Sequence, residues 1–267
     1  MNSQPKISVV TVCFNSGKTI ENTIKSMFAQ TYNNFEYWII DGASKDNTIQ
    51  IIQRYESLFC GKLRYISERD SGIYNAINKG IRLCTGDMVG ILNSDDYYSP
   101  DTLEIVAGKY VELGMETLIL IGNMMRVSQS GEPIYTYRFK QSQVESKSCF
   151  GHPSMFAAKK VYDLIGLYDE SFKLAADGEW QYRALENEHV SCVLCSSVFN
   201  HMREGGASDN YKNRWKWFKE RVRMKQMHGR GSDFTIYLQE FFSLIRTDIK
   251  TILPSKLSAC IYKIRYK

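Results

Sequence analysis

Short apolar runs alternate with amphipathic segments over the first 100 residues of the chain. The apolar runs are rich in β-branched residues and have the length of buried parallel strands; they cover residues 7–13, 35–40, 63–67 and 88–92. The segments between them place apolar residues at helical spacing, over 19–30, 47–59 and 73–83. This alternation predicts an α/β fold, a doubly wound and mostly parallel sheet flanked by helices.

The pattern becomes less regular after residue 101. We expect strands over 118–123 and 190–199 and a hairpin turn over 128–133. A helix is predicted over 159–166, and the Ala-Ala-Asp-Gly-Glu stretch at 175–179 is interpreted as a loop.

Polar or acidic side chains follow each of the first four predicted strands. They are Asn15, Asp41, Asp70 and the adjacent pair Asp95 and Asp96. Ligands in parallel α/β sheets bind outside the carboxyl ends of the strands, so these side chains predict one ligand site. The alternative for each residue taken alone is a turn or a helix N-cap.

The pair Asp95 and Asp96 points to a particular kind of ligand. Two adjacent carboxylates repel each other, and neither is easily buried without a partner. A hard divalent cation, Mg²⁺ or Mn²⁺, resolves that conflict because it prefers carboxylate oxygens. Ser99, Pro100 and Asp101 follow the pair, so an ordinary turn that starts a helix is the alternative.

Charge divides the chain into two parts. The net charge is +5, but residues 209–267 hold 14 Lys and Arg against 5 Asp and Glu, a net charge of +9 that leaves −4 for residues 1–208. We therefore predict a working domain over 1–208 and a basic helical extension over 209–267 that meets an anionic partner. Nucleic acid and an anionic membrane surface are the two candidates.

Cysteine usage and hydropathy indicate the compartment. The seven cysteines have no regular spacing, which argues against a disulfide framework and for a reducing environment. Neither a signal peptide nor a long uncharged apolar run is visible, so we expect neither secretion by that route nor a membrane-spanning segment.

Six motifs, in order along the chain, resemble glycosyltransferase family 2. They are Thr-Val-Cys-Phe-Asn at 11–15, Asp-Gly-Ala-Ser-Lys-Asp-Asn-Thr at 41–48, Glu-Arg-Asp-Ser-Gly-Ile-Tyr-Asn-Ala-Ile-Asn-Lys-Gly at 68–80, Thr-Gly-Asp at 85–87, Leu-Asn-Ser-Asp-Asp at 92–96 and Ala-Ala-Asp-Gly-Glu-Trp at 175–180. The motif at 68–80 is most similar to the branch that builds bacterial O-antigens and exopolysaccharides. The resemblance covers residues 6–208 and implies an inverting transferase with the GT-A fold that uses a nucleoside diphosphate sugar.

The resemblance also implies a donor site. Asp96 would ligate a Mn²⁺ or Mg²⁺ cofactor, with Asp95 beside it on the nucleotide sugar or on a metal-bound water. The family motif is often Asp-x-Asp, and this chain has Ser94 at the first position, which leaves more of the coordination to Asp96. The other donor-binding residues implied by the resemblance are Val12, Phe14, Asn15, Asp41, Ser44 and Asp70.

Several of these roles have a structural alternative. Asp41 either accepts a hydrogen bond from the base or makes an Asx turn with Gly42. Asp70 either meets the base or ribose or caps the helix that starts at Ile73. Phe14 either stacks on the base or packs against the core.

Asp177 is the candidate, by resemblance, for the general base that takes a proton from the acceptor hydroxyl. Its neighbour Glu179 is the rival, and we place Glu179, Trp180, His152 and His201 on the acceptor side or in a closing loop. His152 would approach the acceptor and His201 the diphosphate or the metal. The alternative for an isolated histidine is a structural role.

The extension interleaves cations with apolar residues at helical spacing, which is typical of an interfacial helix on an anionic membrane. A solvated helical hairpin packed on the working domain is the alternative. Transferases of this branch act on lipid-linked acceptors, so the resemblance implies a cytoplasmic protein, peripheral on the inner face of the cell membrane, with a lipid-linked glycan acceptor. No pattern of a nucleic-acid-binding module is visible, so we expect no nucleic-acid partner.

Two rival functions stay open. A non-catalytic nucleotide-sugar or glycan-binding module of the same fold would be favoured by loss of Asp96 or Asp177, and both are present. A sugar nucleotidyltransferase also carries strand-end carboxylates, but it usually needs a Gly-rich, basic phosphate loop near the first strand. Asn15-Ser-Gly-Lys matches such a loop only weakly.

Overall fold

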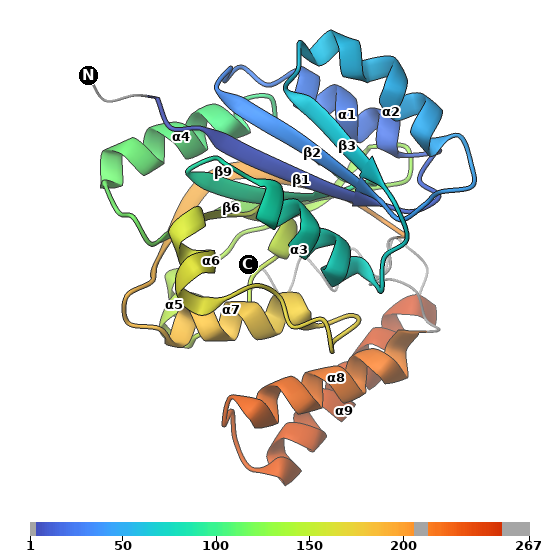
Figure 1. Ribbon diagram of the computed structural model, residues 1–267. Helices are drawn as coiled ribbons and strands as arrows, with labels where there is room; N and C mark the ends of the chain where they lie inside the picture. The colour runs from blue at the N-terminus through green and yellow to red at the C-terminus, as the bar shows by residue number, and fades with distance from the viewer. Residues whose placement is uncertain (1–3, 206–212, 253–267) are drawn as a thin grey trace.

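One mixed sheet organises the part of the chain that the structure describes (Figure 1). The computed structural model describes residues 4–205 and 213–252, with side chains as far as residue 245. The order across the sheet is β3-β2-β1-β4-β8-β6-β9-β5, and β7 pairs with β6. The strands are β1 (Ile7–Cys13), β2 (Phe35–Asp41), β3 (Leu63–Ser67), β4 (Met88–Asn93), β5 (Tyr97–Tyr98), β6 (Leu118–Val127), β7 (Pro133–Tyr137), β8 (Met155–Ala158) and β9 (Ser191–Arg203).

The parallel half of the sheet consists of the four strands that the apolar pattern predicted. β1 lies between β2 and β4 and is parallel to both, and β3 continues the order beyond β2. All seven residues of β1 are buried, which explains its unbroken apolar and β-branched run. Because these strands are parallel, their carboxyl ends meet at one edge of the sheet.

The other half of the sheet contains antiparallel pairs. β8 runs antiparallel to β4 and β6, whereas β6 and β9 are parallel to each other. β6 and β9 extend beyond the predicted ranges, and the hairpin turn at 128–133 joins β6 to β7. The two-residue strand β5 pairs with the end of β9, which brings β9 next to the turn that follows β4.

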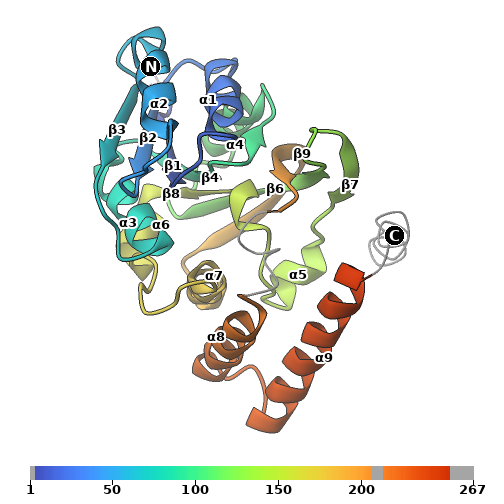
Figure 2. The ribbon, with the colours of Figure 1, turned by 90° about the vertical axis from the view of Figure 1, so that its right-hand side faces the viewer.

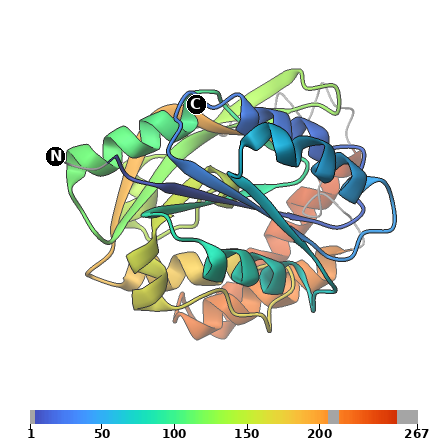
Figure 3. The same ribbon diagram turned by 45° about the horizontal axis from the view of Figure 1, so that its top comes forward.

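Helices cover both faces of the sheet, so the predicted α/β architecture is confirmed. α1, α2 and α4 lie on one face and α3, α6 and α7 on the other (Figure 3). The helices are α1 (Ile20–Phe28), α2 (Thr48–Glu56), α3 (Ile73–Leu83), α4 (Thr102–Leu113), α5 (Gln141–Glu145), α6 (Lys159–Ile165), α7 (Ala176–Glu186), α8 (Arg214–Met227) and α9 (Asp233–Ile252), with short 3₁₀ turns η1 (Ser57–Phe59) and η2 (His152–Ser154).

The prediction of a loop over 175–179 is wrong, because α7 begins at Ala176 and residues 176–179 form its first turn. Asp177 and Glu179 lie in that turn, where negative charge interacts favourably with the helix dipole. Trp180 is fully buried and anchors the helix to the core. The acidic residues that were interpreted as loop chemistry therefore favour a helix start.

The basic extension forms a helical hairpin in its described part, with α8 beside α7 and α9 outside α8 (Figure 2). Met224 of α8 joins the main core, and Phe218, Val222 and Ile236 form a small separate cluster between α8 and α9. The buried Glu240 pairs with cations of α8. Residues 253–267 of the extension, and 209–212 at its start, lie outside the described residues.

One long face of α9 is exposed and apolar. Its exposed side chains are Phe234, Tyr237, Leu238, Phe241, Phe242 and Ile245. No helix in the described ranges is both long enough and apolar enough to cross a membrane.

α3 approaches β1 closely at a glycine. A Cβ atom added to Gly80 would lie 2.3 Å from Cγ1 of Val10, which is well inside van der Waals contact. The absence of a side chain at Gly80 therefore sets the distance between α3 and the sheet, and with it the position of the residues at the start of α3.

Gly80→Ala is expected to lower the free energy of unfolding by about 1–3 kcal/mol, because the new methyl group overlaps the buried Val10 side chain. Gly108→Ala in α4 is the matched control, since a Cβ there meets nothing within 4 Å. This control should stabilise by up to about 1 kcal/mol through helix propensity. Urea denaturation measures both, and the same sign for the two variants would contradict close packing at Gly80.

Candidate active site

The Asp96 carboxylate is buried at the turn that follows β4, where the residue is only 2% exposed. Its Oδ1 accepts a hydrogen bond from the backbone N–H of Arg203 at 3.0 Å, and its Oδ2 accepts one from the Asn93 amide at 3.1 Å. The Asn200 amide lies 3.5 Å from the same Oδ2. Arg203 and Asn200 both belong to β9, so this strand and the turn together hold the acid in place.

The environment of Asp96 disfavours its charged form. Burial first, and the charge of Asp95 second, raise the pKa of Asp96 to about 7, although the hydrogen bonds from Arg203, Asn93 and Asn200 oppose the rise. A divalent cation next to the two acids would favour the ionised form. The electrostatics of this turn therefore fit a cation site.

The described part of the protein offers few ligands for such a cation. Among residues 4–205 and 213–245, no group of three or more His, Cys, Asp or Glu side chains is arranged to hold a metal ion. Mg²⁺ is usually bound by one or two carboxylates together with substrate phosphates and waters. Asp96 and Asp95 therefore fit a cation that is shared with a phosphate-bearing ligand, and they do not fit a closed structural metal site.

His201 at the end of β9 lies beside this acidic turn. It pairs with Tyr97, the residue after Asp96, and the two rings stack at 4.6 Å. Its Nδ1 is buried without a hydrogen-bond partner among the described residues, and burial lowers the pKa of His201. A neutral imidazole nitrogen of this kind is suited to accept a proton or to bind a cation.

Phe14, Gly42 and Asp70 meet at the carboxyl ends of β1, β2 and β3. A Cβ atom at Gly42 would lie 3.4 Å from both Cδ2 of Phe14 and Oδ2 of Asp70. Phe14 is 62% exposed, so its ring is available for stacking rather than used in the core. An exposed ring beside a carboxylate is suited to bind a nucleobase by stacking and by accepting from its N–H groups.

Lys79 is held on the acidic side of this region. Its Nζ lies 2.6 Å from Oδ1 of Asp70 and 2.7 Å from Oε1 of Glu68. These hydrogen bonds raise the pKa of Lys79, so the side chain stays charged and offsets the charge of Asp70.

The Asp41 carboxylate is fully buried and hydrogen-bonded inside the protein. Its Oδ2 accepts from the Ser44 backbone N–H at 2.9 Å and from the Ser67 hydroxyl at 2.7 Å. Its Oδ1 accepts from the Ser44 hydroxyl, with the Cys13 thiol at 3.5 Å. This geometry favours the turn alternative, made with Ser44 rather than Gly42, and contact of Asp41 with a base stays a prediction.

The loops after β1, β2 and β4 are joined by side-chain hydrogen bonds. Asn15 adopts a left-handed backbone conformation, and its Oδ1 accepts from the Lys45 backbone N–H at 2.8 Å while its own N–H donates to the Ser44 hydroxyl. The hydroxyls of Ser16 and Ser94 lie 2.9 Å apart. The strand-end residues predicted from the sequence therefore share one connected rim.

Asp177 faces α3 from the first turn of α7. It is half-buried, and its Oδ1 accepts a hydrogen bond from the Tyr74 hydroxyl at 2.9 Å. Burial, followed by the charge of Asp177, raises the pKa of Tyr74, so the hydroxyl stays protonated and continues to donate. Tyr74 lies four residues after Asp70 in the sequence, and the start of α3 therefore links the surroundings of Phe14 and Asp70 to Asp177.

His152 lies behind this pair in an aromatic cluster. Its Nε2 is 2.7 Å from the Tyr168 hydroxyl, and the Tyr168 ring stacks on the Tyr74 ring with centroids 5.8 Å apart. Burial lowers the pKa of His152, whereas the charge of Asp177 opposes that change. His152 therefore supports the side of the site where Asp177 lies, through Tyr168.

Three other predicted residues have packing contacts. Glu179 forms a two-point ion pair with Arg183, each contact at 2.8 Å, and is buried. The Trp180 indole is fully buried and donates to the Gly166 carbonyl at 2.9 Å. Val12 is buried inside β1. These contacts favour Asp177 over Glu179 as a group that reaches a ligand.

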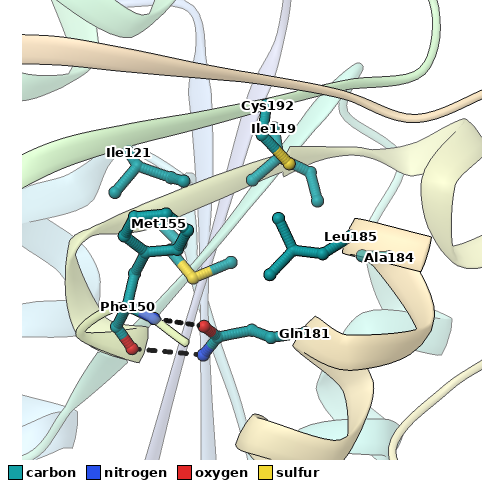
Figure 4. Close-up of a pocket in the computed structure, with 8 residues that line it drawn as sticks. All are labelled: Ile119, Ile121, Phe150, Met155, Gln181, Ala184, Leu185 and Cys192. Atoms are coloured by element: carbon teal, nitrogen blue, oxygen red, sulfur yellow. Dashed lines mark hydrogen bonds between the residues drawn. The ribbon is translucent and has the colours of Figure 1, made fainter. Parts of the chain in front are cut away.

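An apolar hollow lies under α7, away from the acidic residues (Figure 4). Inside it, Gln181 exchanges hydrogen bonds with the backbone of Phe150 at 2.6 and 3.3 Å. The residues that line it are Ile119, Ile121, Phe150, Met155, Gln181, Ala184, Leu185 and Cys192. None of the candidate acids lines this hollow, so we interpret it as part of the core.

Two residues that shape the site were not predicted from the sequence. Tyr74 lies in the first turn of α3, inside the motif at 68–80, and its place in that motif was the signal that could have identified it. Arg203 acts on Asp96 through its backbone N–H, and its Nε donates to the Asp95 carbonyl at 3.2 Å. A backbone contact of this kind leaves no signal in the sequence.

The chain is similar to known proteins in sequence and in fold. The chain matches the profile described as "Glycosyl transferase family 2" over residues 8–162. It is 30% identical over 274 aligned residues to an uncharacterized glycosyltransferase of Mycobacterium tuberculosis, which covers 92% of this chain and 98% of the relative.

Two solved structures share the fold. One is S. aureus TarS 1–349 in complex with UDP-GlcNAc, with a TM-score of 0.66 and 19% identity, covering 89% of this chain and 73% of that one. The other is a mannosyltransferase from Pyrobaculum calidifontis in complex with GDP-Man and Mn²⁺, with a TM-score of 0.61 and 18% identity. The match covers 100% of this chain and 77% of that one.

The raised pKa of Asp96 predicts a particular dependence of stability on pH in metal-free protein. Between about pH 4 and pH 7 the folded state keeps a proton on Asp96 that the unfolded chain, with a pKa of about 3.9, has released. The free energy of unfolding should therefore fall as pH rises through this window and level off above about pH 7. The fall should be on the order of a few kcal/mol.

Urea denaturation in EDTA, compared between wild type and Asp96→Asn, isolates this contribution from that of other groups. Asp101→Asn, an exposed acid nearby, is the control and should follow the wild type. A difference between wild type and Asp96→Asn that stays constant over the whole window would contradict the raised pKa.

Proposed function

Because this chain belongs to glycosyltransferase family 2 and has the GT-A fold, we propose that it is an inverting, metal-dependent transferase that moves a hexosyl group from a nucleoside diphosphate sugar to an acceptor hydroxyl. As a member of the family it is a glycosyltransferase that acts on nucleotide sugars. The single observation that carries the proposal is the buried Asp96 beside Asp95 at the same sheet edge as Phe14 and Asp70.

The nucleotide would bind along this edge. The exposed Phe14 ring and the Asp70 carboxylate provide a stacking surface and an acceptor for the base. The diphosphate would then extend towards the turn with Asp95 and Asp96, because both regions follow neighbouring strands of the parallel sheet. The known ligands of the two similar structures, UDP-GlcNAc and GDP-Man, support a uridine or guanosine diphosphate sugar as the donor.

Asp96 and Asp95 would hold Mn²⁺ or Mg²⁺, with His201 near them. The cation, when bound, neutralises charge on the diphosphate as it leaves. The raised pKa of Asp96 supports this assignment, and so does His201, whose Nδ1 has no hydrogen-bond partner within 4–205 and 213–245, because both groups gain from a nearby cation. The Mn²⁺ in the Pyrobaculum calidifontis mannosyltransferase complex supports it further.

Asp177 would act as the general base. In a single displacement, the acceptor oxygen bonds to the anomeric carbon, the bond from that carbon to the diphosphate oxygen breaks, and the acceptor proton passes to the Asp177 carboxylate. The hydrogen bond from the Tyr74 hydroxyl fixes the orientation of that carboxylate before the reaction. Attack from the face opposite to the leaving group inverts the configuration at the anomeric carbon.

The acceptor would be a lipid-linked glycan of a bacterial surface polysaccharide, reached from the cytoplasmic face of the membrane. The exposed apolar face of α9 supports a membrane location, because aromatic and aliphatic side chains of one helix face solvent together. The sequence that follows α9, residues 253–267, holds four cations and no acidic residue, which is complementary to anionic lipids.

Asp177→Asn is expected to reduce kcat by about 10²- to 10⁴-fold while leaving donor affinity within about twofold, because the amide cannot take the proton. The measurement combines turnover and calorimetric binding across UDP-, GDP- and dTDP-sugars, with Mn²⁺ and with EDTA. Asp163→Asn, the same change at an exposed acid of α6, is the control. Metal-independent binding of a donor with no turnover by wild type would favour a non-catalytic binding module.

The double variant Phe234→Ser with Phe242→Ser is expected to reduce flotation with phosphatidylglycerol-containing vesicles by about tenfold or more, because full burial of a Phe side chain contributes about 1.5–3 kcal/mol. Leu58→Ser with Val111→Ser is the control, since these apolar side chains are also at least half exposed but lie elsewhere. Equal flotation of the two double variants would contradict membrane docking through α9. Loss of a dimer, rather than of flotation, would assign the face to a second copy of the chain.

A further inference from the structure

We propose that Glu220 of α8 is a positioning residue for Asp177, so that the basic extension holds the general base in place. This inference rests on the proposed role of Asp177 and names a residue that lies outside the six motifs. Glu220 acts through the segment 173–175 that leads into α7, and it does not itself reach a ligand.

The Glu220 carboxylate accepts hydrogen bonds from three consecutive backbone N–H groups. Its Oε2 accepts from Lys173 at 3.0 Å, from Leu174 at 2.8 Å and from Ala175 at 3.0 Å, and its Oε1 also lies 3.0 Å from the Lys173 nitrogen. Successive N–H groups that converge in this way form an anion-binding concavity. Here the protein's own carboxylate occupies it.

This concavity stands directly before the first residue of α7. Ala175 is the N-cap of the helix, its side chain makes no capping hydrogen bond, and Asp177 is the second helical residue. The Glu220 carboxylate therefore satisfies the N–H groups of the segment that enters the helix, including that of the N-cap residue Ala175, and its charge also interacts favourably with the N-terminal end of the helix dipole. Charge-assisted hydrogen bonds of this kind are stronger than neutral ones, so the three N–H groups are held firmly.

The same face of α8 contacts the chain on both sides of Asp177. A Cβ atom at Gly178 would lie 2.9 Å from Sδ of Met224, so α8 packs against the residue next to the base. Before Asp177, the Arg223 guanidinium lies 4.1 Å from the Phe172 ring centroid and donates to the Ser171 hydroxyl at 2.8 Å. Glu220 is thus the middle contact of a surface that fixes the start of α7.

The segment that Glu220 holds also reaches the nucleobase side of the site. Nζ of Lys173 donates to the Ser71 carbonyl at 3.3 Å, next to Asp70. Glu170 accepts from the amides of Asn75 and Asn78 on α3, each at 2.9 Å. The chain from 170 to 177 therefore spans the two halves of the site, and Glu220 anchors its last part.

The orientation of Asp177 depends on this anchor. Its hydrogen bond to Tyr74 comes from α3, whereas its backbone is set by the start of α7. Without the three hydrogen bonds to Glu220, the segment 173–175 loses its fixed partner, and a displacement of about 1 Å at a reacting group can cost about 10²-fold in rate.

Glu220→Gln tests the proposal with little change in shape. The amide keeps one acceptor oxygen but places an NH₂ group against backbone donors, so the amides of 173–175 should exchange with deuterium about tenfold faster or more. We expect kcat for sugar transfer to fall by about tenfold or more, with KM for the donor within about twofold. Glu220→Asp, which keeps the charge on a shorter side chain, should recover part of both effects.

Two controls separate positioning from general loss of structure. Lys219→Ala changes the exposed neighbour on the same helix and should match wild type in exchange and in kcat. Glu240→Gln weakens the ion pairs between α9 and α8 without touching the segment 173–175, and it should lower the melting temperature without raising exchange at 173–175.

Wild-type exchange at 173–175 in Glu220→Gln would overturn the proposal, and so would a fall in kcat that Glu240→Gln reproduces. The exchange measurement does not depend on turnover. If wild type transfers no sugar from any donor but Glu220→Gln still speeds exchange at 173–175, the proposed function fails while the anchoring of α7 by Glu220 stands.

Discussion

A carboxylate pair at the end of a buried strand is the constraint around which this structure is arranged. β4 lies in the centre of the sheet, between the parallel β1 and the antiparallel β8, so the acids that follow it lie at the edge where the parallel strands end. β9 supplies the hydrogen-bond donors that stabilise the buried Asp96 carboxylate. The two-residue strand β5 pairs with β9 and holds its end next to the turn that contains Asp96. The acidic turn, the end of β9 and the loop after β1 are therefore one structural unit.

The parallel half of the sheet could be predicted because β1, β2 and β4 are buried along nearly their whole length and are largely apolar in sequence, while β3 is a partly exposed edge strand. The short strands β5 and β8 and helix α5 were not predicted, since each depends on partners far along the chain. The loop at 175–179 became a helix start because its acids favour an N-terminal turn. Local composition therefore predicts buried strands and helix starts, and it does not predict elements that form only through pairing with distant parts of the chain.

The candidate site residues could likewise be predicted only in part. The strand-end acids could be found because the geometry of parallel sheets brings such residues together, and the structure places Phe14, Asp70 and the loop that carries Asp95 and Asp96 on one rim. What sequence could not distinguish was the direction of each side chain. Asp41 turns inward to Ser44 and Ser67, and Glu179 turns to Arg183, although both are as acidic as their neighbours.

The contact of α8 with the start of α7 changes how the chain can be divided. A shortened protein that ends at residue 208 would retain every motif, yet it would leave three backbone N–H groups of 173–175 without their carboxylate and would expose the surface that Met224 covers. Trimming the extension would thus remove the exposed apolar face of α9 and the carboxylate that holds the segment leading into α7 in one step. Residue 208 marks a shift in charge, while the packing contacts of residues 1–208 continue into α8 through Glu220 and Met224.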